Sequence, residues 1–248
     1  MVFHPYNQPL RQKITLKIHK SAISEKDDIK YLGIMIDSTL TWKTHIENVS
    51  TKISKSIGLF YKIRHFVNLK IMRTLYYSLT YPYLIYAIEV WGSADITHLN
   101  RLLILQKRIV RLITFADKRF DDFSFAPSDP LFFKLEILKI SDIFKMMVSK
   151  FIFKCLNKTN PVNFHFWYNS TSQVHNHNTR SKSVDIDNSV LTRTLFIPIA
   201  RTTHYGLKLL KVQGPKIWNK LSPLLRINTS INSFIKELKK KSISEYNY

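Results

Sequence analysis

The sequence predicts a mainly α-helical (α+β) protein that carries a short β-hairpin near its N-terminal end. Hydrophobic residues make up 45% of the 248 residues and aromatic residues 13%, which is enough to build a core. Apolar residues recur at steps of three and four through most of the chain, as they do in amphipathic helices. Only 5 glycines and 9 prolines are present, which disfavours a sandwich or barrel built on many tight turns. The length allows one large domain or two small ones.

Two stretches near the N-terminus have the character of β-strands. Residues 13–19 (KITLKIH) alternate basic or polar with apolar positions, and residues 29–37 (IKYLGIMID) form an isoleucine-rich run. We expect the two stretches to pair as a β-hairpin across the polar connection between them. Gly33 inside the second run predicts a bulge or a close approach of another backbone. Asp37 or Ser38 is placed to cap the helix that follows.

Helices account for most of the remaining chain. The first helix after the hairpin is predicted from an apolar face that consists of Ile46, Val49, Ile53, Ile57, Phe60 and Ile63. The further predicted helices cover residues 69–80, 83–91, 97–114, 131–138, 141–157, 214–225 and 230–241. The second helix ends before Pro82, because a proline disfavours the α conformation of the residue that precedes it. Residues 116–130 form a predicted loop, and residues 159–194 a polar, irregular arm.

The charge balance is the clearest indication of a partner. Lys and Arg number 38 against 17 Asp and Glu, so the formal net charge is 38 − 17 = +21. Self-repulsion at this charge costs stability, and binding to a polyanion relieves that cost. Nucleic acid is therefore the first candidate partner and an anionic membrane surface the second. The remaining interpretation is a basic but inert protein.

The sequence indicates neither secretion nor a membrane span. The N-terminal residues contain no apolar segment long enough for a signal peptide, and Cys155 is the only cysteine, so no disulfide framework can form within the chain. The most apolar stretch, residues 75–91, is interrupted by Pro82 and carries Glu89, which favours buried aromatic-rich helices over a membrane helix. We expect an intracellular protein of the nucleus or cytoplasm, without a membrane partner.

Basic residues lie off the apolar stripes of two predicted helices. In the 97–114 helix, Arg101, Arg108 and Arg111 are spaced by seven and three, so they project on one side, and three lysines of the first helix are spaced likewise. Lys and Arg neutralise phosphates, and arginine can bond them bidentately. The alternative is that these faces are merely solvated and keep a leucine-rich bundle soluble. The predicted nucleic-acid-binding residues are Lys52, Lys55, Lys62, Arg64, Arg101, Lys107, Arg108 and Arg111.

Several other residue groups suggest chemistry but have simpler explanations. The two aspartates at residues 121–122 lie between aromatic residues in RFDDF and mimic a metal-binding carboxylate pair, but they fall in a predicted loop without a third acidic partner. His175, His177 and the other histidines show no metal-ligand spacing, so no metal site is predicted. We expect Cys155 and the aromatic residues of the 76–91 segment to fill the core.

Stretches spread along the chain carry a resemblance to a known family. They are MVFHP at the start, KYLGIMIDSTLTWKTHI (30–46), LYYSLTYPYLIYAIEVWG (75–92), LNRLLILQKRIVRLIT (99–114), HNTRSKS (177–183) and GPKIWNKLSPLLR (214–226). In this order they resemble the reverse transcriptase of non-LTR retrotransposons of the jockey type, over nearly the whole chain. In that family a YLG-type strand pair, the primer grip, ends the palm, and a helical thumb follows it.

The resemblance implies a division of the chain and a second set of site residues. The implied segments are a palm-end β-hairpin remnant (1–37), a thumb-like helical bundle (38–128), a helical extension (129–158), an irregular polar arm (159–213) and a C-terminal basic helical segment (214–248). Tyr31, Leu32 and Gly33 become primer-grip-like residues that touch the primer 3′ end. The alternative for these three is simple packing of the hairpin under the thumb.

The resemblance also implies that the catalytic centre lies elsewhere. Reverse transcriptases hold two metal ions with aspartates of an aromatic-Ala-Asp-Asp turn and of an earlier palm strand, both upstream of the YLG strand. Only 30 residues precede Tyr31, they contain no such turn, and Asp27 and Asp28 lack apolar flanks. We therefore expect no catalytic residue and no cofactor in this chain, although Mg²⁺ is implied for the full-length polymerase.

The predicted function is that of a fragment of an RNA-directed DNA polymerase of a transposable element. Its basic helices would bind RNA and DNA in a template–primer duplex while the missing palm and fingers of the same polyprotein extend the primer, so the chain alone is expected to be inactive. Two alternatives stay open. One is a domesticated nucleic-acid-binding helical adaptor. The other is a non-functional relic with an apolar patch around Leu32, Ile34 and Ile36, where the palm once sat.

Overall fold

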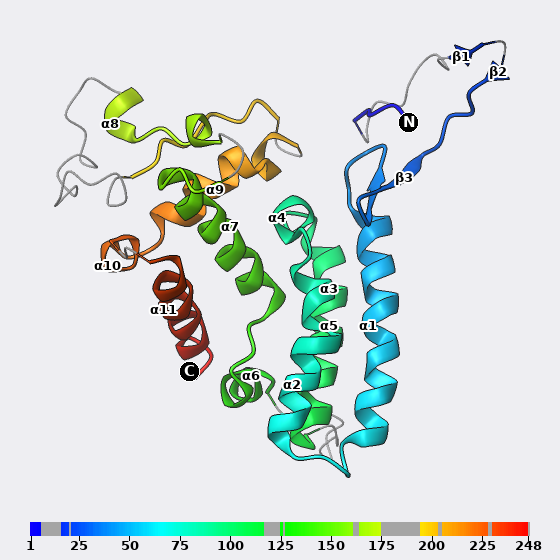
Figure 1. Cartoon of the computed structure of the whole chain (residues 1–248), viewed down its shortest axis with the longest axis vertical. Helices are drawn as coiled ribbons and strands as arrows, with labels where there is room; N and C mark the ends of the chain where they lie inside the picture. The colour runs from blue at the N-terminus through cyan, green and yellow to red at the C-terminus, as the bar shows by residue number, and fades with distance from the viewer. Residues whose placement is uncertain are drawn as a thin grey trace.

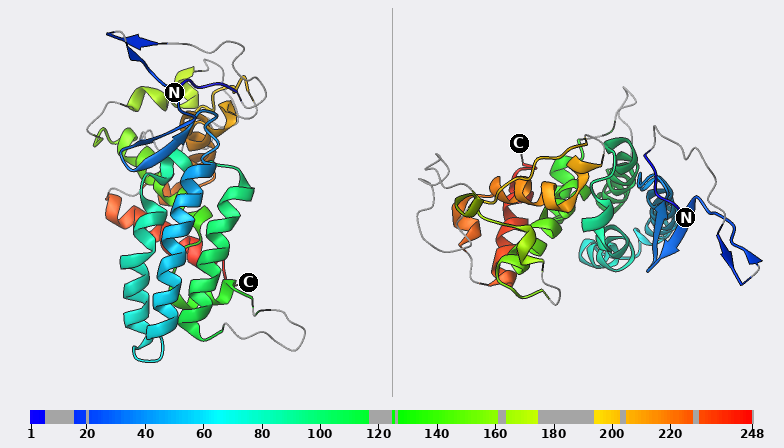
Figure 2. Two further views of the ribbon diagram at one scale, coloured as in Figure 1. Left: turned by 90° about the vertical axis from the view of Figure 1, so that its right-hand side faces the viewer. Right: turned by 90° about the horizontal axis from the view of Figure 1, so that it is seen from above.

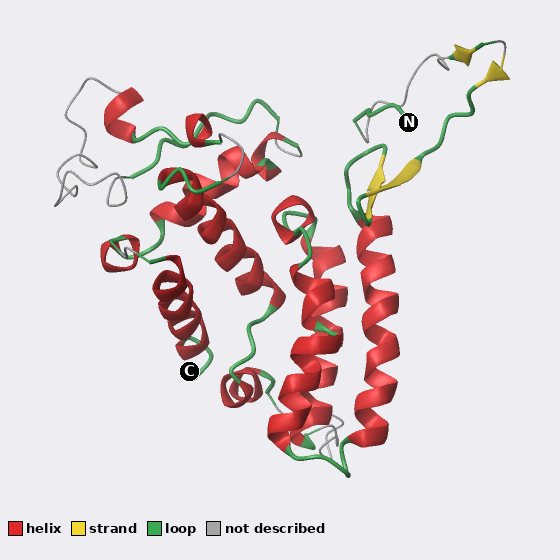
Figure 3. Ribbon diagram, in the orientation of Figure 1, coloured by secondary structure: helices red, strands yellow, loops and turns green. Residues whose placement is uncertain are grey.

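The protein is mainly α-helical, as predicted, in a computed structural model (Figure 1). The structure describes residues 1–5, 16–19, 21–116, 125, 127–160, 164–174, 194–202, 205–227 and 230–247. Helices dominate these residues, and the strands are confined to the N-terminal part (Figure 3). Residues 117–124 and 126 of the predicted loop at 116–130, the stretch HNTRSKS and most of the predicted polar arm lie outside the described residues.

The strands form two separate antiparallel pairs, which corrects the predicted pairing of residues 13–19 with residues 29–37. The IKYLGIMID stretch instead folds back on itself, so that Tyr31 pairs with Ile34. Leu32 (φ 45°) and Gly33 (φ 82°) form the connection, with the two positive φ angles of the tight turns that suit twisted hairpins. This local closure costs less chain entropy than a pairing across the longer polar connection. The strands are β1 (Lys17–Ile18), β2 (Ser21–Ala22), β3 (Asp28–Tyr31) and β4 (Ile34–Asp37).

The helices fall into two groups that share one core (Figure 1). In the N-terminal group α1, α2, α3 and α5 stand side by side, and in the C-terminal group α9 and α11 pack on α7. Helix α7 also contacts α3, α4 and α5, so it joins the two groups. The helices are α1 (Lys43–Ile63), α2 (Leu69–Leu79), α3 (Tyr81–Ile85), α4 (Ile88–Trp91), α5 (Ile96–Thr114), α6 (Asp129–Leu135), α7 (Ile140–Leu156), α8 (Thr171–Val174), α9 (Leu210–Asn219), α10 (Pro223–Arg226) and α11 (Ile231–Ser244). Two 3₁₀ turns are η1 (His165–Trp167) and η3 (Gly206–Lys208).

The predicted single helix over residues 83–91 is two short helices. Tyr86 is extended and Ala87 adopts a left-handed conformation (φ 49°), which separates α3 from α4. Trp91 stabilises the break, because its indole Nε1 donates a hydrogen bond to the Tyr86 carbonyl oxygen at 2.8 Å. Pro82 lies in the first turn of α3, where the missing backbone N–H costs nothing.

The predicted helix start at Gly214 is also wrong, because α9 begins at Leu210 and contains Pro215 in its interior. A proline at this position removes one helical hydrogen bond, which normally ends a helix. Tertiary packing overrides this preference. Gly214 and Pro215 are buried, and a Cβ atom at Gly214 would come within 3.0 Å of the Tyr168 ring. Close packing of the two segments therefore keeps the helix continuous.

The predicted helix over residues 131–138 is shorter at its C-terminal end. Helix α6 ends at Leu135, because Glu136 adopts a left-handed conformation (φ 51°) and closes the helix. Ile137 and Leu138 then continue into the core as an extended connection to α7. Cys155 on α7 is buried, as predicted, and burial raises the pKa of its thiol to about 11, so this cysteine is not a thiolate at neutral pH.

Candidate nucleic-acid interface

The tip of the β3–β4 hairpin is exposed and is anchored from one side. Tyr31 is 62% exposed and Leu32 72%, so both predicted primer-grip-like side chains face solvent. The Tyr86 hydroxyl donates a hydrogen bond to the Leu32 carbonyl oxygen, and its ring lies beside the Cα of Gly33. The predicted close approach at Gly33 is therefore made by a side chain of the helical group, and the glycine lies in a turn and not in a bulge.

Asp37 fixes the junction between the hairpin and α1. Its carboxylate accepts hydrogen bonds from the backbone N–H groups of Thr41 (2.8 Å) and Trp42 (2.7 Å), and from the hydroxyls of Thr39 and Thr41. Burial by itself would raise the pKa of this carboxyl group, but the four hydrogen bonds together hold the pKa below its ordinary value of 3.8. Asp37 thus satisfies backbone donors of the turn just before α1. The prediction that Asp37 or Ser38 caps this helix is wrong, because Trp42 is its N-cap residue and makes no side-chain capping hydrogen bond.

His45 provides the second link between the hairpin and α1. The backbone N–H of Met35 donates to His45 Nδ1 at 3.3 Å, which requires an unprotonated Nδ1. The ring packs at 5.3 Å from the Trp91 ring in the core. Burial, and next the charge of Lys52, lower the pKa of His45 to about 4. The imidazole is therefore neutral at physiological pH, and the hairpin rests on the N-terminal end of α1 (Figure 2).

The predicted lysine stripe of α1 is exposed. Lys52, Lys55 and Lys62 all lie on the surface, off the buried face of the helix. Lys52 leans toward α3, where its ammonium group lies 5.4 Å from the centre of the Tyr83 ring. The stripe therefore presents three cations along one side of a 21-residue helix, from its middle to the end that lies away from the hairpin.

The arginine stripe of α5 borders α1. Arg101 and Arg108 are exposed, and the guanidinium of Arg101 forms an ion pair with Glu47 of α1 at 3.0 Å. Both partners are half exposed, so this pair contributes little to stability. The pair does show how the two stripes are placed. The exposed arginines lie on the edge of α5 that adjoins α1. Lys52 lies on the edge of α1 that adjoins α3.

The other three predicted cations are partly buried, and two of them contact aromatic rings. The Arg111 guanidinium lies 4.9 Å from the centre of the Phe125 ring, and burial lowers its pKa. Arg64 lies 5.0 Å from the Tyr61 ring and 5.1 Å from the Phe115 ring. Such cation–π contacts hold the guanidinium groups against the protein. Lys107 is also partly buried. These three residues are less available to a ligand than the five exposed ones.

The aromatic residues between 76 and 91 divide into two sets. Tyr76 and Trp91 are fully buried, as predicted for core residues. Tyr83 and Tyr86 are exposed, so the prediction that this whole segment fills the core is wrong for them. Tyr86 is the residue that sequence reasoning missed, because nothing in the sequence connects position 86 with the turn at Leu32.

Acidic and histidine residues form no metal site in the part of the chain that the structure describes. There, no group of three or more His, Cys, Asp and Glu side chains is arranged to hold a metal ion. The RFDDF aspartates and the histidines at positions 175, 177 and 204 lie outside the described residues. None of the described helices is long and apolar enough to cross a lipid bilayer.

Replacing Gly33 by alanine is expected to destabilise the protein by about 1–2 kcal/mol, because Gly33 has φ +82° and L-residues are strained there. The new Cβ would meet the Tyr86 ring at 3.5 Å, an ordinary contact, so strain and not collision causes the loss. Gly58→Ala is the matched control. It lies within α1 with open space around it, and alanine there should stabilise by about 0.5–1 kcal/mol. Urea denaturation of both variants tests the opposite signs, and two equal shifts would contradict them.

The protein is thus a helical bundle that carries a surface-anchored hairpin and two cationic stripes. Comparison with known proteins shows which proteins its sequence resembles. The chain is 32% identical over 113 residues to the RNA-directed DNA polymerase from mobile element jockey of Drosophila funebris, covering 44% of this chain and 12% of that protein. It is 36% identical over 89 residues to the jockey polymerase of Drosophila melanogaster, covering 34% and 10%. The probable RNA-directed DNA polymerase from transposon X-element of Drosophila melanogaster is 27% identical over 100 residues, covering 39% and 11%.

These relatives confirm the resemblance to jockey-type reverse transcriptases for part of the chain. The chain spans about a tenth of the length of the curated relatives it matches. No family model matches the chain, and no solved structure does.

Proposed function

We propose that this chain is the C-terminal part of a reverse transcriptase of a jockey-type retrotransposon. In this proposal residues 1–37 end the palm, residues 38–128 form the thumb, and the following segments complete the C-terminal region. Its task is to hold an RNA–DNA or DNA duplex for an active centre on the palm and fingers of the same polyprotein. The relatives support this proposal by their names, RNA-directed DNA polymerases of mobile elements.

One observation carries the proposal: the exposed hairpin tip is fixed onto α1, which bears one cationic stripe and borders the other. Asp37, His45 and Tyr86 hold the hairpin in place through the contacts described above. A strand tip that must meet a primer end needs such a fixed position relative to the cations that hold the duplex. The binding itself is directed at the phosphate backbone, so its affinity should fall steeply with salt and depend little on base sequence.

Metal chemistry is assigned to another part of the polyprotein. Polymerases transfer nucleotides with the help of two bound metal ions, and in this proposal the aspartates that hold these ions lie on the palm of the same polyprotein. Mg²⁺ is therefore proposed as the cofactor of the full-length polymerase only, and no step is attributed to it here. The residues of this chain bind and position the template–primer.

The test compares pairs of charge-removing substitutions that leave equal net charge. Arg101→Gln with Arg108→Gln removes the arginine stripe, and Lys55→Gln with Lys62→Gln reduces the lysine stripe. We expect each pair to weaken binding of a primer–template duplex roughly tenfold at low salt, and to reduce the slope of log affinity against log salt by about 2. Fluorescence anisotropy over a salt series measures both quantities.

Lys236→Gln with Lys240→Gln is the matched control, because both residues are exposed on α11 and the pair removes the same charge. This control should lose little affinity. If it loses as much as the stripe variants, net charge alone explains the binding and the proposed interface is wrong. Lys52 is left intact in all variants, because its charge contributes, after burial, to lowering the pKa of His45, and its removal would change that pKa as well as the surface charge.

The adaptor function is a second candidate, and one observation favours it. The buried residues form a single cluster that runs from Ile46 of α1 to Tyr246 after α11, so the helical groups support each other within this chain. A chain that folds on its own could bind nucleic acid without a polymerase partner. In the same assay, an adaptor would bind single strands as well as the primer–template duplex, whereas the thumb function requires a preference for the duplex.

A further inference from the structure

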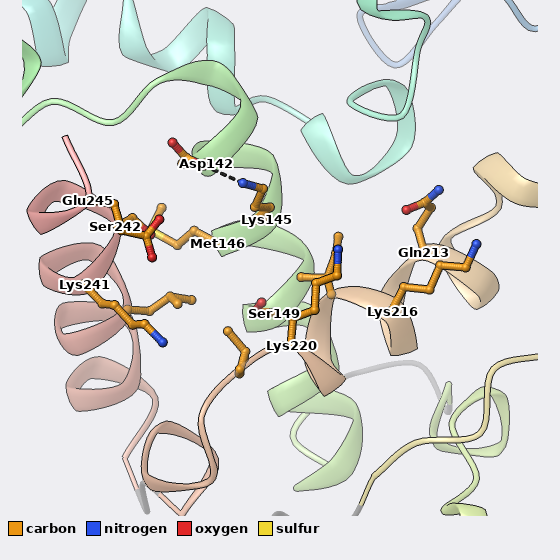
Figure 4. A pocket seen from close by; sticks show the side chains of 13 residues that line it. Asp142, Lys145, Met146, Ser149, Gln213, Lys216, Lys220, Lys241, Ser242 and Glu245 are labelled. Atoms are coloured by element: carbon orange, nitrogen blue, oxygen red, sulfur yellow. Dashed lines mark hydrogen bonds and ion pairs between the residues drawn. The ribbon is translucent and has the colours of Figure 1, made fainter. Parts of the chain in front are cut away.

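A cavity lies in the C-terminal helical group, away from both cationic stripes. Helices α9 and α11 both pack on α7, and a cavity of about 310 Å³ opens between them (Figure 4). Met146 and Ser149 of α7 lie at its floor. Its volume is at the lower end of the range for ligand pockets, large enough for a small anionic group and not for a large cofactor.

The lining of this cavity is predominantly cationic. Lys145, Lys216, Lys220 and Lys241 line it, against the acidic residues Asp142 and Glu245, so the lining has a formal charge of 4 − 2 = +2. Lys216 of α9 and Lys220, the C-cap residue of that helix, are four residues apart, and Lys241 belongs to α11 (Figure 4). Lysines from α9 and α11 thus line the same cavity.

Asp142 does not oppose an anion in the cavity, because its carboxylate is already engaged. Lys145 forms an ion pair with one carboxylate oxygen at 2.8 Å, and the Tyr246 hydroxyl donates to the other. Within the part of the chain that the structure describes, Lys216, Lys220 and Lys241 form no ion pair. Around the cavity, the exposed carboxylate of Glu245 at the end of α11 is thus the remaining negative charge that faces these three lysines.

The floor carries an independent indication of a ligand. Ser149 is fully buried, and its Oγ has no hydrogen-bond partner among the described residues. A buried hydroxyl without a partner costs free energy that folding would otherwise avoid. Ser149 lies on the side of α7 that faces the cavity (Figure 4), and a ligand oxygen there would accept its hydrogen bond.

We propose that this cavity binds a phosphate group of a polynucleotide backbone, with Lys216, Lys220 and Lys241 as charge partners and Ser149 as a hydrogen-bond donor. Lysine acts on phosphate as a mobile point charge, and a serine hydroxyl adds direction. Lys216 is partly buried and Lys220 is exposed, so the cationic lining runs from the recess to the surface. This row of lysines suits a polynucleotide that continues beyond the cavity. The identification of a polynucleotide as the source of the phosphate rests on the proposed function.

The test uses the full chain with Lys216→Gln and Lys241→Gln together, and labelled oligo(dT) as the probe. We expect the double variant to bind the oligonucleotide roughly tenfold more weakly at low salt, with the salt slope reduced by about 1.4 for two lost phosphate contacts on a single strand. Lys236→Gln with Lys240→Gln removes the same charge from the opposite side of α11 and should change binding much less. Equal losses in the two variants would overturn the proposal.

Ser149→Ala provides a second variant that should fold at least as well as the parent, because it removes an unpartnered buried hydroxyl. Weaker oligonucleotide binding at an unchanged melting temperature supports the site, and unchanged affinity in both cavity variants contradicts it. Pyrophosphate is added as a competitor. If pyrophosphate binds in a cavity-dependent way while oligonucleotide binding is unaffected by the cavity variants, the site takes free phosphates and the assignment to a polynucleotide is wrong.

The same measurements separate this inference from the proposed thumb function. If the Arg101 and Arg108 variant binds the duplex normally while the cavity variant loses oligonucleotide binding, the thumb interface fails and the cavity site stands. The reverse result retains the thumb and removes the cavity site.

Discussion

Replacing Gln106 by leucine is expected to lower the free energy of unfolding by about 3–5 kcal/mol. Gln106 is fully buried on α5, and its amide makes three hydrogen bonds. Its Nε2 donates to the Tyr76 hydroxyl (2.9 Å) and to the Leu138 carbonyl oxygen (3.1 Å), and its Oε1 accepts from the Ile140 backbone N–H (2.9 Å). Leucine fills the space but leaves these three groups buried without partners, each at about 1–3 kcal/mol.

Urea denaturation measures this loss, and a double-mutant cycle shows its cause. Tyr76→Phe alone should cost about 1–3 kcal/mol, since it leaves one buried N–H of the Gln106 amide without a partner. Combined with Gln106→Leu it should cost less than the sum of the two, because the tyrosine hydroxyl is no longer left unpaired. A cost below about 1 kcal/mol for Gln106→Leu would show that the three groups find other partners, and would remove the link between α2, α5 and the start of α7.

Acidification from pH 7 to pH 4 is expected to reduce stability by about 3 kcal/mol through His45 alone. Burial and the charge of Lys52 give this histidine a folded-state pKa of about 4, against 6.5 in the unfolded chain. The unfolded state therefore binds the proton more tightly. The stabilising contribution is fully present above pH 6.5 and is lost as the pH falls toward 4, at about 1.4 kcal/mol per pH unit.

His45→Gln is the control for this prediction, because its amide oxygen can still accept from the Met35 N–H while it does not titrate. The variant should show a much flatter stability profile between pH 7 and pH 4. Asp37 also loses its contribution in acid, but its folded pKa lies below 3.8, so that loss occurs at lower pH. An unchanged slope in the His45 variant would contradict the assignment.

The long helices follow directly from the sequence. The apolar positions predicted for the first helix, from Ile46 to Phe60, are all buried in α1, and the 97–114 prediction differs from α5 by one residue at its start. A 3.6-residue period is a local property, so one sequence suffices to reveal it. The exposure of the lysine stripe follows from the same period.

The errors lie where tertiary contacts override local preference. Pro215 would end a helix in isolation, but close packing at Gly214 keeps α9 continuous. The break between α3 and α4 depends on a hydrogen bond from Trp91 to the Tyr86 backbone, which spacing does not reveal. The predicted pairing of residues 13–19 with residues 29–37 is wrong, because the 29–37 stretch pairs with itself. The apolar pattern of a strand does not show which partner strand it pairs with.

The sequence by itself determined that this protein is helical, strongly basic and built around amphipathic helices with cations on their outer faces, because composition and helical periodicity depend only on neighbouring residues. The tertiary structure decided which of those cations remain exposed and which contact aromatic rings, as Arg64 and Arg111 do. It also decided that Tyr86 anchors a turn 54 residues away, and that three separate helices enclose one cationic cavity. These features join residues far apart in the chain, and only side-chain packing in the folded state brings them together.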